Sequence, residues 1–449
     1  MSTVLFWFRS DLRLHDQPAL HAALASGATR LLPVACLPAQ DEAAPWGFAR
    51  VGPHRRAFTA AALRGLGERM AALGNPLLIC QAPPAMALPR LAQAVGATMV
   101  VCEDIAAPYE QAEVAALRAA GLQVRCVWHS SLLPPACMPW PVDQLPGVFT
   151  TFRQQVERAG ITPAAPLPAP ARLPPPPDVH AWMTEDILQA VGAGQGAAAL
   201  RAPALQAGCD PRSSFPYGTP ACNGSEAAAL DHLARYLERK LPHSYKATRN
   251  GLTGLDYSSK FSPWLATGAL SPRRIYAQLK DFERCHGANE GTYWLWFELL
   301  WRDYFRLLHL QHGAALYRAQ GLSNRPSAQH SAHGFERWCQ GETGEPLVDA
   351  AMRELAATGY LSNRLRQVAA SYLIYDLHGD WRAGAAWFES QLVDYDVYSN
   401  QANWLYIAGC GTDPRGGRRF NPARQAQDHD AGGHYRRLWA AAHTPQDAL

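Results

Sequence analysis

The chain lacks several features that would place it in a membrane, a secretory route or a zinc-binding class. None of its 449 residues belongs to an apolar run approaching the roughly 18 residues of a transmembrane helix. Residues 1–9 have no basic stretch ahead of an apolar one, so we expect no signal peptide. The ten cysteines form no C-x-x-C pair, which disfavours a metal site or a dithiol redox site. We therefore expect a cytoplasmic protein with reduced thiols and no metal.

Net charge and phosphate-binding glycines are also scarce. Lys and Arg total 41 against 38 Asp and Glu, and a net charge of +3 is too small to indicate a nucleic-acid partner without a local basic patch. No G-x-G-x-x-G follows the first apolar run, which disfavours a dinucleotide-binding Rossmann unit. Tryptophan, in contrast, is abundant: nine of the 14 lie from Trp264 onward, an excess that points beyond core filling.

Short apolar runs alternate with Ala-rich helical stretches in the N-terminal part of the chain. The runs cover residues 4–8, 31–37, 77–80, 98–102 and 123–127. This alternation predicts a parallel sheet built from βαβ units, with a ligand site at the carboxyl ends of the strands. Those ends carry the polar residues Arg9, Asp11, Glu103 and Asp104.

The pattern changes twice after the predicted sheet. Residues 163–177 contain eight prolines and predict an extended linker, followed by a weakly patterned connection with short helices. From Gly224 onward the apolar spacing is helical, as in Leu365, Val368, Ala369, Tyr372 and Leu373, or in Trp294, Phe297, Trp301, Tyr304 and Leu308. We predict an α/β domain (1–135), a proline-rich connection (136–224) and an all-α domain (225–449).

Five polar segments of the helical part could carry chemistry or could be structural. Glu298 shares a helical face with Trp294 and Trp301, and the spacing alone favours a surface ion pair with Arg302. The carboxylates of Asp394 and Asp396 could cap a helix or bind a buried heteroaromatic ligand, and the spacing does not decide between them.

The other three segments are basic or rich in hydroxyls. Asn363 could cap a helix whose first turn holds Arg364 and Arg366, and these arginines need anionic partners there. The Gly-rich basic loop at 415–421 is either a solvated loop or a phosphate contact. The segment 257–262 could bind phosphate oxygens or form an ordinary cap.

Taken together and in this order, these segments resemble the photolyase/cryptochrome family, especially its DASH-type cryptochromes. The resemblance is carried by residues 6–16, 248–266, 292–305, 352–364 and 380–421. It implies an N-terminal α/β domain, a linker and a helical domain that holds FAD non-covalently. It also implies light-driven repair of cyclobutane pyrimidine dimers by electron transfer from excited reduced FAD, a lyase reaction of the deoxyribodipyrimidine photolyase type.

The resemblance assigns roles to particular positions. Those expected to hold FAD are Tyr245, Ser258, Ser259, Lys260, Phe261, Ser262, Glu298, Arg366, Asp394, Asp396 and Asn400, with Arg366 pairing with Asp394. An amide at Asn400 can hydrogen-bond flavin N5 but cannot readily protonate it. Those expected to act on the lesion are Glu298, Asn363, Trp301 and Asn400, and those expected to contact DNA are Arg249, Trp301, Arg364, Tyr406, Arg418 and Gln425.

Three departures from the family pattern bear on function. Tyr406 and Gln367 stand where duplex photolyases carry Trp and Met, which favours single-stranded DNA, where flipping a dimer costs less. Trp404 and Trp381 match the electron path to the flavin, but its outer position falls near Ala328. Either another aromatic such as Trp387 or Tyr375 ends that path, or photoreduction is impaired.

The third departure concerns a second chromophore. Glu110 matches the carboxylate that binds a methenyltetrahydrofolate antenna, although residues 106–109 diverge. We expect a monomer acting on dimers in single-stranded DNA. The alternatives are a blue-light photoreceptor with little or no repair and a flavoprotein with vestigial activity.

Overall fold

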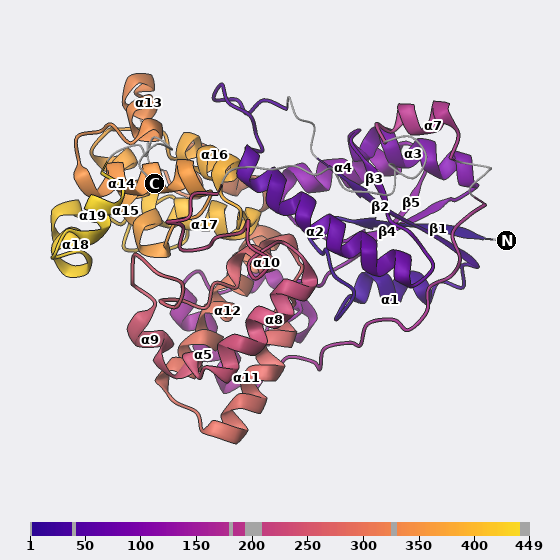
Figure 1. Ribbon diagram of the computed structural model, residues 1–449, viewed down its shortest axis with the longest axis horizontal. Coiled ribbons are helices and arrows are strands. Elements are labelled where there is room, and N and C mark those ends of the chain that lie inside the picture. The colour runs from indigo at the N-terminus through magenta and orange to yellow at the C-terminus, as the bar shows by residue number, and fades with distance from the viewer. Residues whose placement is uncertain (1, 38–41, 179–182, 194–208, 325–329, 441–449) are drawn as a thin grey trace, which may run out of the picture.

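The computed structural model describes residues 2–37, 42–178, 183–193, 209–324 and 330–440. An α/β domain and a larger helical domain lie side by side (Figure 1). Five strands form one parallel sheet in the order β3-β2-β1-β4-β5. They are β1 (Thr3–Phe8), β2 (Arg30–Cys36), β3 (Leu78–Cys80), β4 (Met99–Glu103) and β5 (Gln123–Val127). The predicted parallel α/β domain is confirmed, and no strand follows β5 among the described residues.

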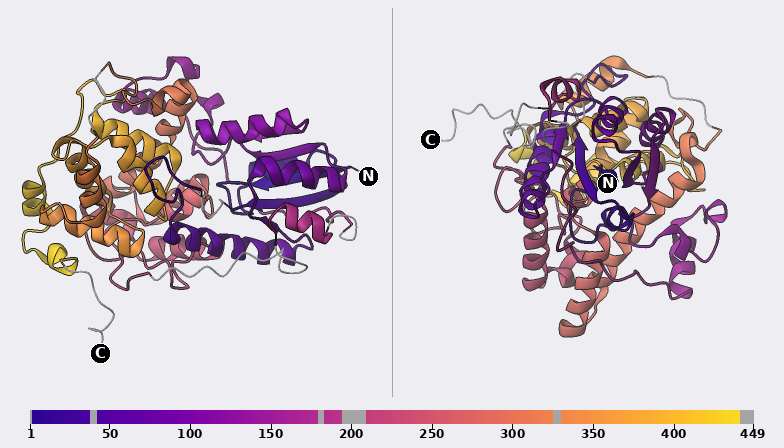
Figure 2. Two further views of the ribbon diagram at one scale, coloured as in Figure 1. Left: turned by 90° about the horizontal axis from the view of Figure 1, so that it is seen from above. Right: turned by 90° about the vertical axis from the view of Figure 1, so that its right-hand side faces the viewer.

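Helices cover both faces of this sheet, as the views in Figure 2 show. Helices α1 (Pro18–Leu24) and α2 (Pro53–Ala72) pack against one face, and α3 (Pro84–Val95) and α4 (Pro108–Ala119) pack against the other. Alternate residues of β1 enter the two apolar clusters. Burial on both faces explains why the strands read as continuous apolar runs rather than as alternating ones.

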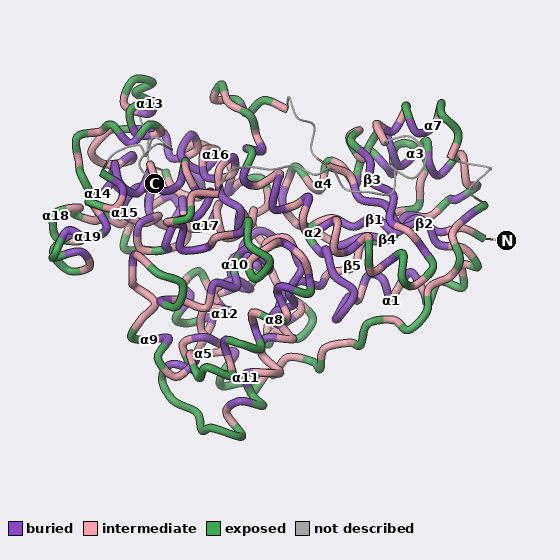
Figure 3. The backbone as a smooth tube through the Cα atoms, in the orientation of Figure 1, coloured by how far each residue is buried: buried purple, intermediate pink, exposed green. Residues whose placement is uncertain are grey.

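The proline-rich segment runs without helix or strand along the α/β domain, and much of it is exposed in Figure 3. Proline has no N–H to donate, but its carbonyl oxygen still accepts hydrogen bonds. Pro174 accepts from Asn75 Nδ2 at 2.7 Å, and Pro175 accepts from the backbone N–H of Leu31 at 3.1 Å. The linker is thus fastened to the α/β domain it leaves. The short helix α7 (Glu185–Ala190) then packs beside α3.

Two apolar clusters form the core of the helical domain. The first surrounds α12 (Glu290–His312) and takes in α8 (Glu226–Glu238), α10 (Ser262–Thr267) and α11 (Pro272–His286). It also includes α5 (Phe149–Arg158), a helix inside the segment predicted to be a connection. The second lies among α13 (Ala332–Gln340), α14 (Pro346–Thr358), α15 (Asn363–Tyr375), α16 (Trp381–Gln391) and α17 (Val397–Ala408). The remaining helices are α9 (Tyr245–Thr248), α18 (Pro422–His429) and α19 (His434–Leu438).

The loop that follows β1 fixes the two domains to each other. Asp16 pairs with Arg273 at 2.5 Å, and Arg13 donates to the carbonyl of Gly268 at 2.9 Å. Gly268 has a φ of +71°, and a Cβ there would lie 2.0 Å from the carbonyl oxygen of Ser10, so the approach requires glycine. This contact positions the carboxyl end of β1 against the helical domain.

Candidate functional site

Three of the residues predicted to hold the cofactor lie together: Arg366 of α15, Ser262 at the start of α10 and Asp394 in the turn before α17. Arg366 Nη2 donates to both carboxylate oxygens of Asp394, at 2.9 and 2.8 Å. The hydroxyl of Ser262 donates to the same carboxylate at 2.7 Å. Asp394 is therefore the anionic partner that Arg366 needs at the start of α15. The helix N-cap before α10 is Phe261, so Ser262 is not an ordinary cap.

Lys260 is a buried cation beside this ion pair. Its side chain is 3% exposed, and its ammonium lies 3.3 Å from the ring centroid of Tyr257 and 4.9 Å from that of Tyr360. Burial holds the pKa of Lys260 well below its usual value. Its Nζ has no hydrogen-bond partner among the described residues. A buried amino group without an acceptor is costly, and an anionic group such as a diphosphate would supply the missing acceptor.

Asp396 and Asn400 begin and continue α17 beside the same pocket. Asp396 caps the helix by accepting from the N–H of Ser399 at 2.8 Å, and it also accepts from Arg306 Nη2 at 2.7 Å. Although burial opposes ionisation, Arg306 and Arg302 hold the pKa of Asp396 well below its usual range. Asn400 donates to the carbonyl of Ala385 at 3.0 Å. Of the two acidic residues, Asp396 is therefore a helix cap, whereas Asp394 is not.

Arg366, Asp394, Asp396 and Asn400 line one pocket in the helical domain. Its walls include Asn363, Arg366, Gln367, Asp394, Asp396, Asn400 and Trp404. Asn363 is the exposed first residue of α15, but the side chain that caps the helix is Ser362, which accepts from the N–H of Leu365. The expected cap at Asn363 is therefore wrong, and its amide is left beside the pocket.

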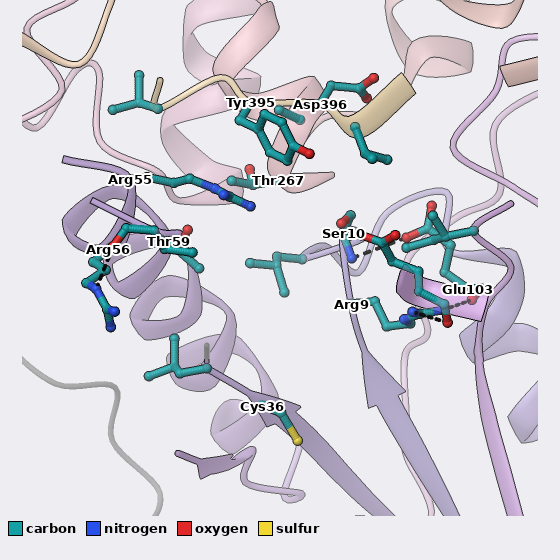
Figure 4. Close-up of a pocket in the computed structure, with 18 of the residues that line it drawn as sticks. Arg9, Ser10, Cys36, Arg55, Arg56, Thr59, Glu103, Thr267, Tyr395 and Asp396 are labelled. Atoms are coloured by element: carbon teal, nitrogen blue, oxygen red, sulfur yellow. Dashed lines mark hydrogen bonds between the residues drawn. The ribbon is translucent and has the colours of Figure 1, made fainter. Parts of the chain in front are cut away.

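A second cavity, of about 680 Å³, lies where the sheet meets the helical domain (Figure 4). Arg9, Cys36 and Glu103, at the carboxyl ends of three strands, form one wall, and residues 393 and 395–398 form another. Arg9 and Glu103 thus lie at the carboxyl ends of the strands, as predicted from the sequence. Asp11, in contrast, is fully buried against Gln17 and His129, outside the cavity lining.

Glu110, in the first turn of α4, also lines this cavity. Burial raises the pKa of Glu110 to about 7, despite the lowering effect of Arg9. Its Oε2 is buried and has no hydrogen-bond partner among the described residues. An orphaned buried carboxylate oxygen facing a cavity marks a place where a ligand could donate hydrogen bonds.

Glu298 pairs across the fold rather than along its own helix. Its carboxylate binds Arg249, whose guanidinium also lies 4.7 Å from the ring centroid of Trp294. Arg302, the partner expected from the spacing, is buried and donates to the carbonyl of Leu265 at 2.9 Å. The predicted ion pair of Glu298 with Arg302 is therefore wrong, because Arg302 satisfies backbone carbonyls at the domain junction.

Trp301 and Tyr406 line another pocket together. Trp301 stacks on Phe149 of α5, with centroids 3.6 Å apart and ring planes 11° apart, and Arg415 borders the same pocket. Arg418 lies 4.9 Å above the ring of Tyr406. No sequence pattern singles out Phe149, because it belongs to the segment expected to be a connection.

The residues predicted to contact DNA differ in their partners: Arg418 has an acidic one, Arg364 a neutral one, and Gln425 none described. Arg418 donates to Asp413 at 2.8 Å, and Arg415 pairs with the same carboxylate at 3.2 Å. Arg364 donates to the side-chain oxygen of Asn250 at 3.1 Å. Gln425 lies on α18 with a buried Oε1 that has no described partner. The basic loop is thus folded around an internal acid, a feature that its residue composition did not indicate.

The expected electron-path residues lie on neighbouring helices, α16 and α17. Trp404 is buried and makes edge contacts with Phe388 at 5.2 Å and Trp338 at 6.3 Å between centroids. Trp381 donates from Nε1 to the carbonyl of Ala319 at 2.9 Å. The position near Ala328 lies outside the described residues. Trp387 packs on Phe48, and the hydroxyl of Tyr375 donates to the carbonyl of Ile407.

Among the described residues, no group of His, Cys, Asp and Glu side chains could hold a metal ion. None of the described helices combines the length and apolar character needed to cross a membrane.

Comparisons with known proteins agree with one another. Residues 4–171 match the family model described as DNA photolyase, and residues 294–447 match the FAD binding domain of DNA photolyase. The chain is 42% identical to the cryptochrome DASH of Gloeobacter violaceus, over 97% of this chain and 85% of that one. A solved cryptochrome of Synechocystis superposes with a TM-score of 0.86 at 40% identity, covering 98% and 88% of the two chains. A class III photolyase from Agrobacterium tumefaciens superposes with a TM-score of 0.74 at 28% identity, covering 98% and 86%.

Proposed function

The chain belongs to the photolyase/cryptochrome family, with cryptochrome DASH proteins among its relatives, and we propose that it repairs cyclobutane pyrimidine dimers in single-stranded DNA under blue light. The observation that carries this proposal is the partly exposed carboxylate of Glu298, which lies on the same helix as Trp301. A carboxylate can hydrogen-bond a flipped base, an arginine can bind phosphate, and an indole can stack on the lesion.

The residues present fit FAD. Lys260 supplies a buried amino group without an acceptor, and Arg366, Asp394 and Asn400 supply fixed polar groups. When bound in reduced form and excited by light, FAD supplies the electron that splits the dimer. The chain's own contribution is to bind the cofactor, exclude water and offer at Asn400 an amide that does not readily donate a proton.

Strand preference is the finer part of the proposal. Tyr406 offers a smaller stacking surface than tryptophan, so a dimer flipped from duplex DNA gains less in compensation for unstacking. We expect faster repair of a dimer in a single-stranded oligonucleotide than of the same dimer in duplex. Equal rates on the two substrates would contradict the preference for single-stranded DNA but not the repair activity itself.

Replacing Tyr406 with tryptophan should raise the repair rate of duplex substrate by about 3- to 10-fold, because base stacking on an aromatic side chain contributes about 1–3 kcal/mol. The rate on single strands should change less. The matched control is Tyr276→Trp, because Tyr276 lies on α11 and does not line the pocket. A duplex rate that stays at the wild-type value would show that Tyr406 does not limit duplex repair.

We further propose that Glu110 accepts hydrogen bonds from a methenyltetrahydrofolate antenna in the 680 Å³ cavity. Glu110→Gln should weaken folate binding at least about 10-fold, because the amide replaces one of the two acceptor oxygens with an N–H donor and leaves a ligand donor unsatisfied. The near-ultraviolet band gained on reconstitution measures binding. Glu68→Gln, exposed on α2, is the control. Folate binding by Glu110→Gln at the wild-type affinity would show that this carboxylate does not bind the antenna.

A photoreceptor without repair is the second candidate. The Arg249–Glu298 ion pair favours it, because that contact occupies the carboxylate a lesion would need. Under the repair proposal, a DNA phosphate draws Arg249 away and releases Glu298 for the base.

A further inference from the structure

Two pairs of cysteines face each other across neighbouring strands of the sheet. Cys102 of β4 is in register with Cys126 of β5, and Cys36 of β2 is in register with Cys80 of β3. All four side chains belong to the apolar cluster beneath α3 and α4. Neighbouring strands lie about 4.8 Å apart. This spacing is within the range of about 4.4–6.8 Å between Cα atoms that a disulfide spans.

Two arginines, Arg118 and the Glu113-paired Arg9, lie near the Cys102–Cys126 pair. Arg118 Nη2 donates to the Cys126 sulfur at 3.7 Å. The hydrogen bond from the Cys102 thiol, together with Arg118 and Arg9, lowers the pKa of Cys126 to about 7 against the opposing effects of burial and Asp104. Cys126 is also partly exposed on an edge strand, whereas Cys102 is buried. A partly exposed thiol near an arginine is the usual setting of a reactive cysteine.

The Cys36–Cys80 pair has the same register without the same charges. The hydrogen bond with Cys80 and burial both raise the pKa of Cys36 well above its usual value. Cys36 is among the residues that line the 680 Å³ cavity (Figure 4). The Cys36–Cys80 pair is therefore a matched control for the effect of the nearby arginines on the Cys102–Cys126 pair.

We propose that Cys126 is a peroxide-reactive thiol and that Cys102 resolves it, closing a disulfide between β4 and β5. The Cys126 thiolate attacks one peroxide oxygen, the O–O bond breaks, and the other oxygen leaves with a proton as water or an alcohol. Cys126 is thereby oxidised to a sulfenic acid. The Cys102 sulfur then attacks Cys126, the S–S bond forms, the S–O bond breaks, and the second oxygen leaves as water with the Cys102 proton.

The proposed disulfide would lie next to a residue that lines the 680 Å³ cavity. The residue after Cys102 is Glu103, whose carboxylate accepts from the N–H of Ser10 at 3.2 Å and whose carbonyl accepts from Arg9 at 3.3 Å. Both Arg9 and Glu103 line the 680 Å³ cavity. Closing the disulfide fixes the strand end that forms this wall. The inference does not depend on the proposed repair activity.

The test is to treat the full-length, reduced protein with hydrogen peroxide near pH 7, alkylate the remaining thiols at intervals, and identify the oxidised peptides by mass spectrometry. We expect the Cys102–Cys126 disulfide to form at least about 5-fold faster than Cys36–Cys80. We also expect Cys126 to be lost faster than the exposed thiols Cys137 and Cys285. Equal rates for the two pairs, or oxidation of Cys137 and Cys285 first, would overturn the proposal.

Variants separate the two steps. Cys102→Ser should leave Cys126 as a sulfenic acid that dimedone captures, and Cys126→Ser should leave Cys102 unoxidised. Arg118→Gln should slow loss of Cys126 about 3- to 10-fold, because fewer Cys126 thiols are ionised at pH 7. Since Arg118 is exposed, this variant keeps the core intact. An unchanged rate in Arg118→Gln would overturn the role assigned to the charged environment.

Discussion

Replacing Glu298 with alanine should lower light-driven repair of a dimer in single-stranded DNA by about 10- to 100-fold. A hydrogen bond to a charged group contributes about 1.5–3 kcal/mol, and each 1.4 kcal/mol is a tenfold change in rate or affinity. The substitution leaves Arg249, the present partner of Glu298, free to bind phosphate. DNA binding should therefore change less than repair. The measurement is the initial rate of repair under blue light, with FAD content matched between proteins.

The matched control lies on the same helix. Glu290 pairs with Lys246 at 2.9 Å, and its side chain is 79% exposed. Glu290→Ala removes the same functional group from α12 away from the lesion contacts, and it should repair at the wild-type rate. If Glu298→Ala also retained wild-type repair, the carboxylate would have no role in recognising the dimer.

Replacing Arg366 with methionine should remove FAD and destabilise the helical domain by about 3–5 kcal/mol. Breaking a buried ion pair by removing one partner leaves an uncompensated charge, here the carboxylate of Asp394, whose side chain is 1% exposed. Ser262 remains as the only other described donor to that carboxylate. Urea unfolding measures the loss of stability, and the ratio of flavin to protein absorbance measures retained FAD.

A surface ion pair in the same domain provides the comparison. Arg382 pairs with Asp380 at 2.6 Å, but its side chain is 38% exposed. Arg382→Met should cost less than about 1 kcal/mol and should leave FAD content unchanged, because exposed ion pairs contribute little. Full FAD retention in Arg366→Met would mean that the Arg366–Asp394 pair does not organise the cofactor site.

The sequence predicted the elements whose apolar spacing has a clear period. The five short apolar runs became the five strands, and Leu365, Val368, Ala369 and Leu373 form the buried face of α15. Helix α5 was missed because it lies inside a segment whose prolines and polar residues suggested a connection. Because Phe149 of this helix stacks on Trp301, a residue of the candidate site was missed together with the helix.

Side-chain partners were harder to predict than elements. Glu298 and Arg302 satisfy the helical spacing of an ion pair, but Glu298 binds Arg249, which is far away in the sequence. The packing of Arg302 against the domain junction decides this, and no local pattern encodes it. The same limit applies to the cysteines. The absence of C-x-x-C disfavoured a dithiol site, yet strand register brings Cys102 and Cys126 together.

Light-dependent repair of a single-stranded oligonucleotide carrying one cyclobutane pyrimidine dimer tests the central claim most directly. The reduced, FAD-loaded protein is illuminated with blue light or kept dark, and chromatography quantifies the restored oligonucleotide. We predict many dimers restored per protein molecule in the light and none in the dark. No restoration in the light, by protein that retains its FAD and absorbs blue light, would contradict the repair function.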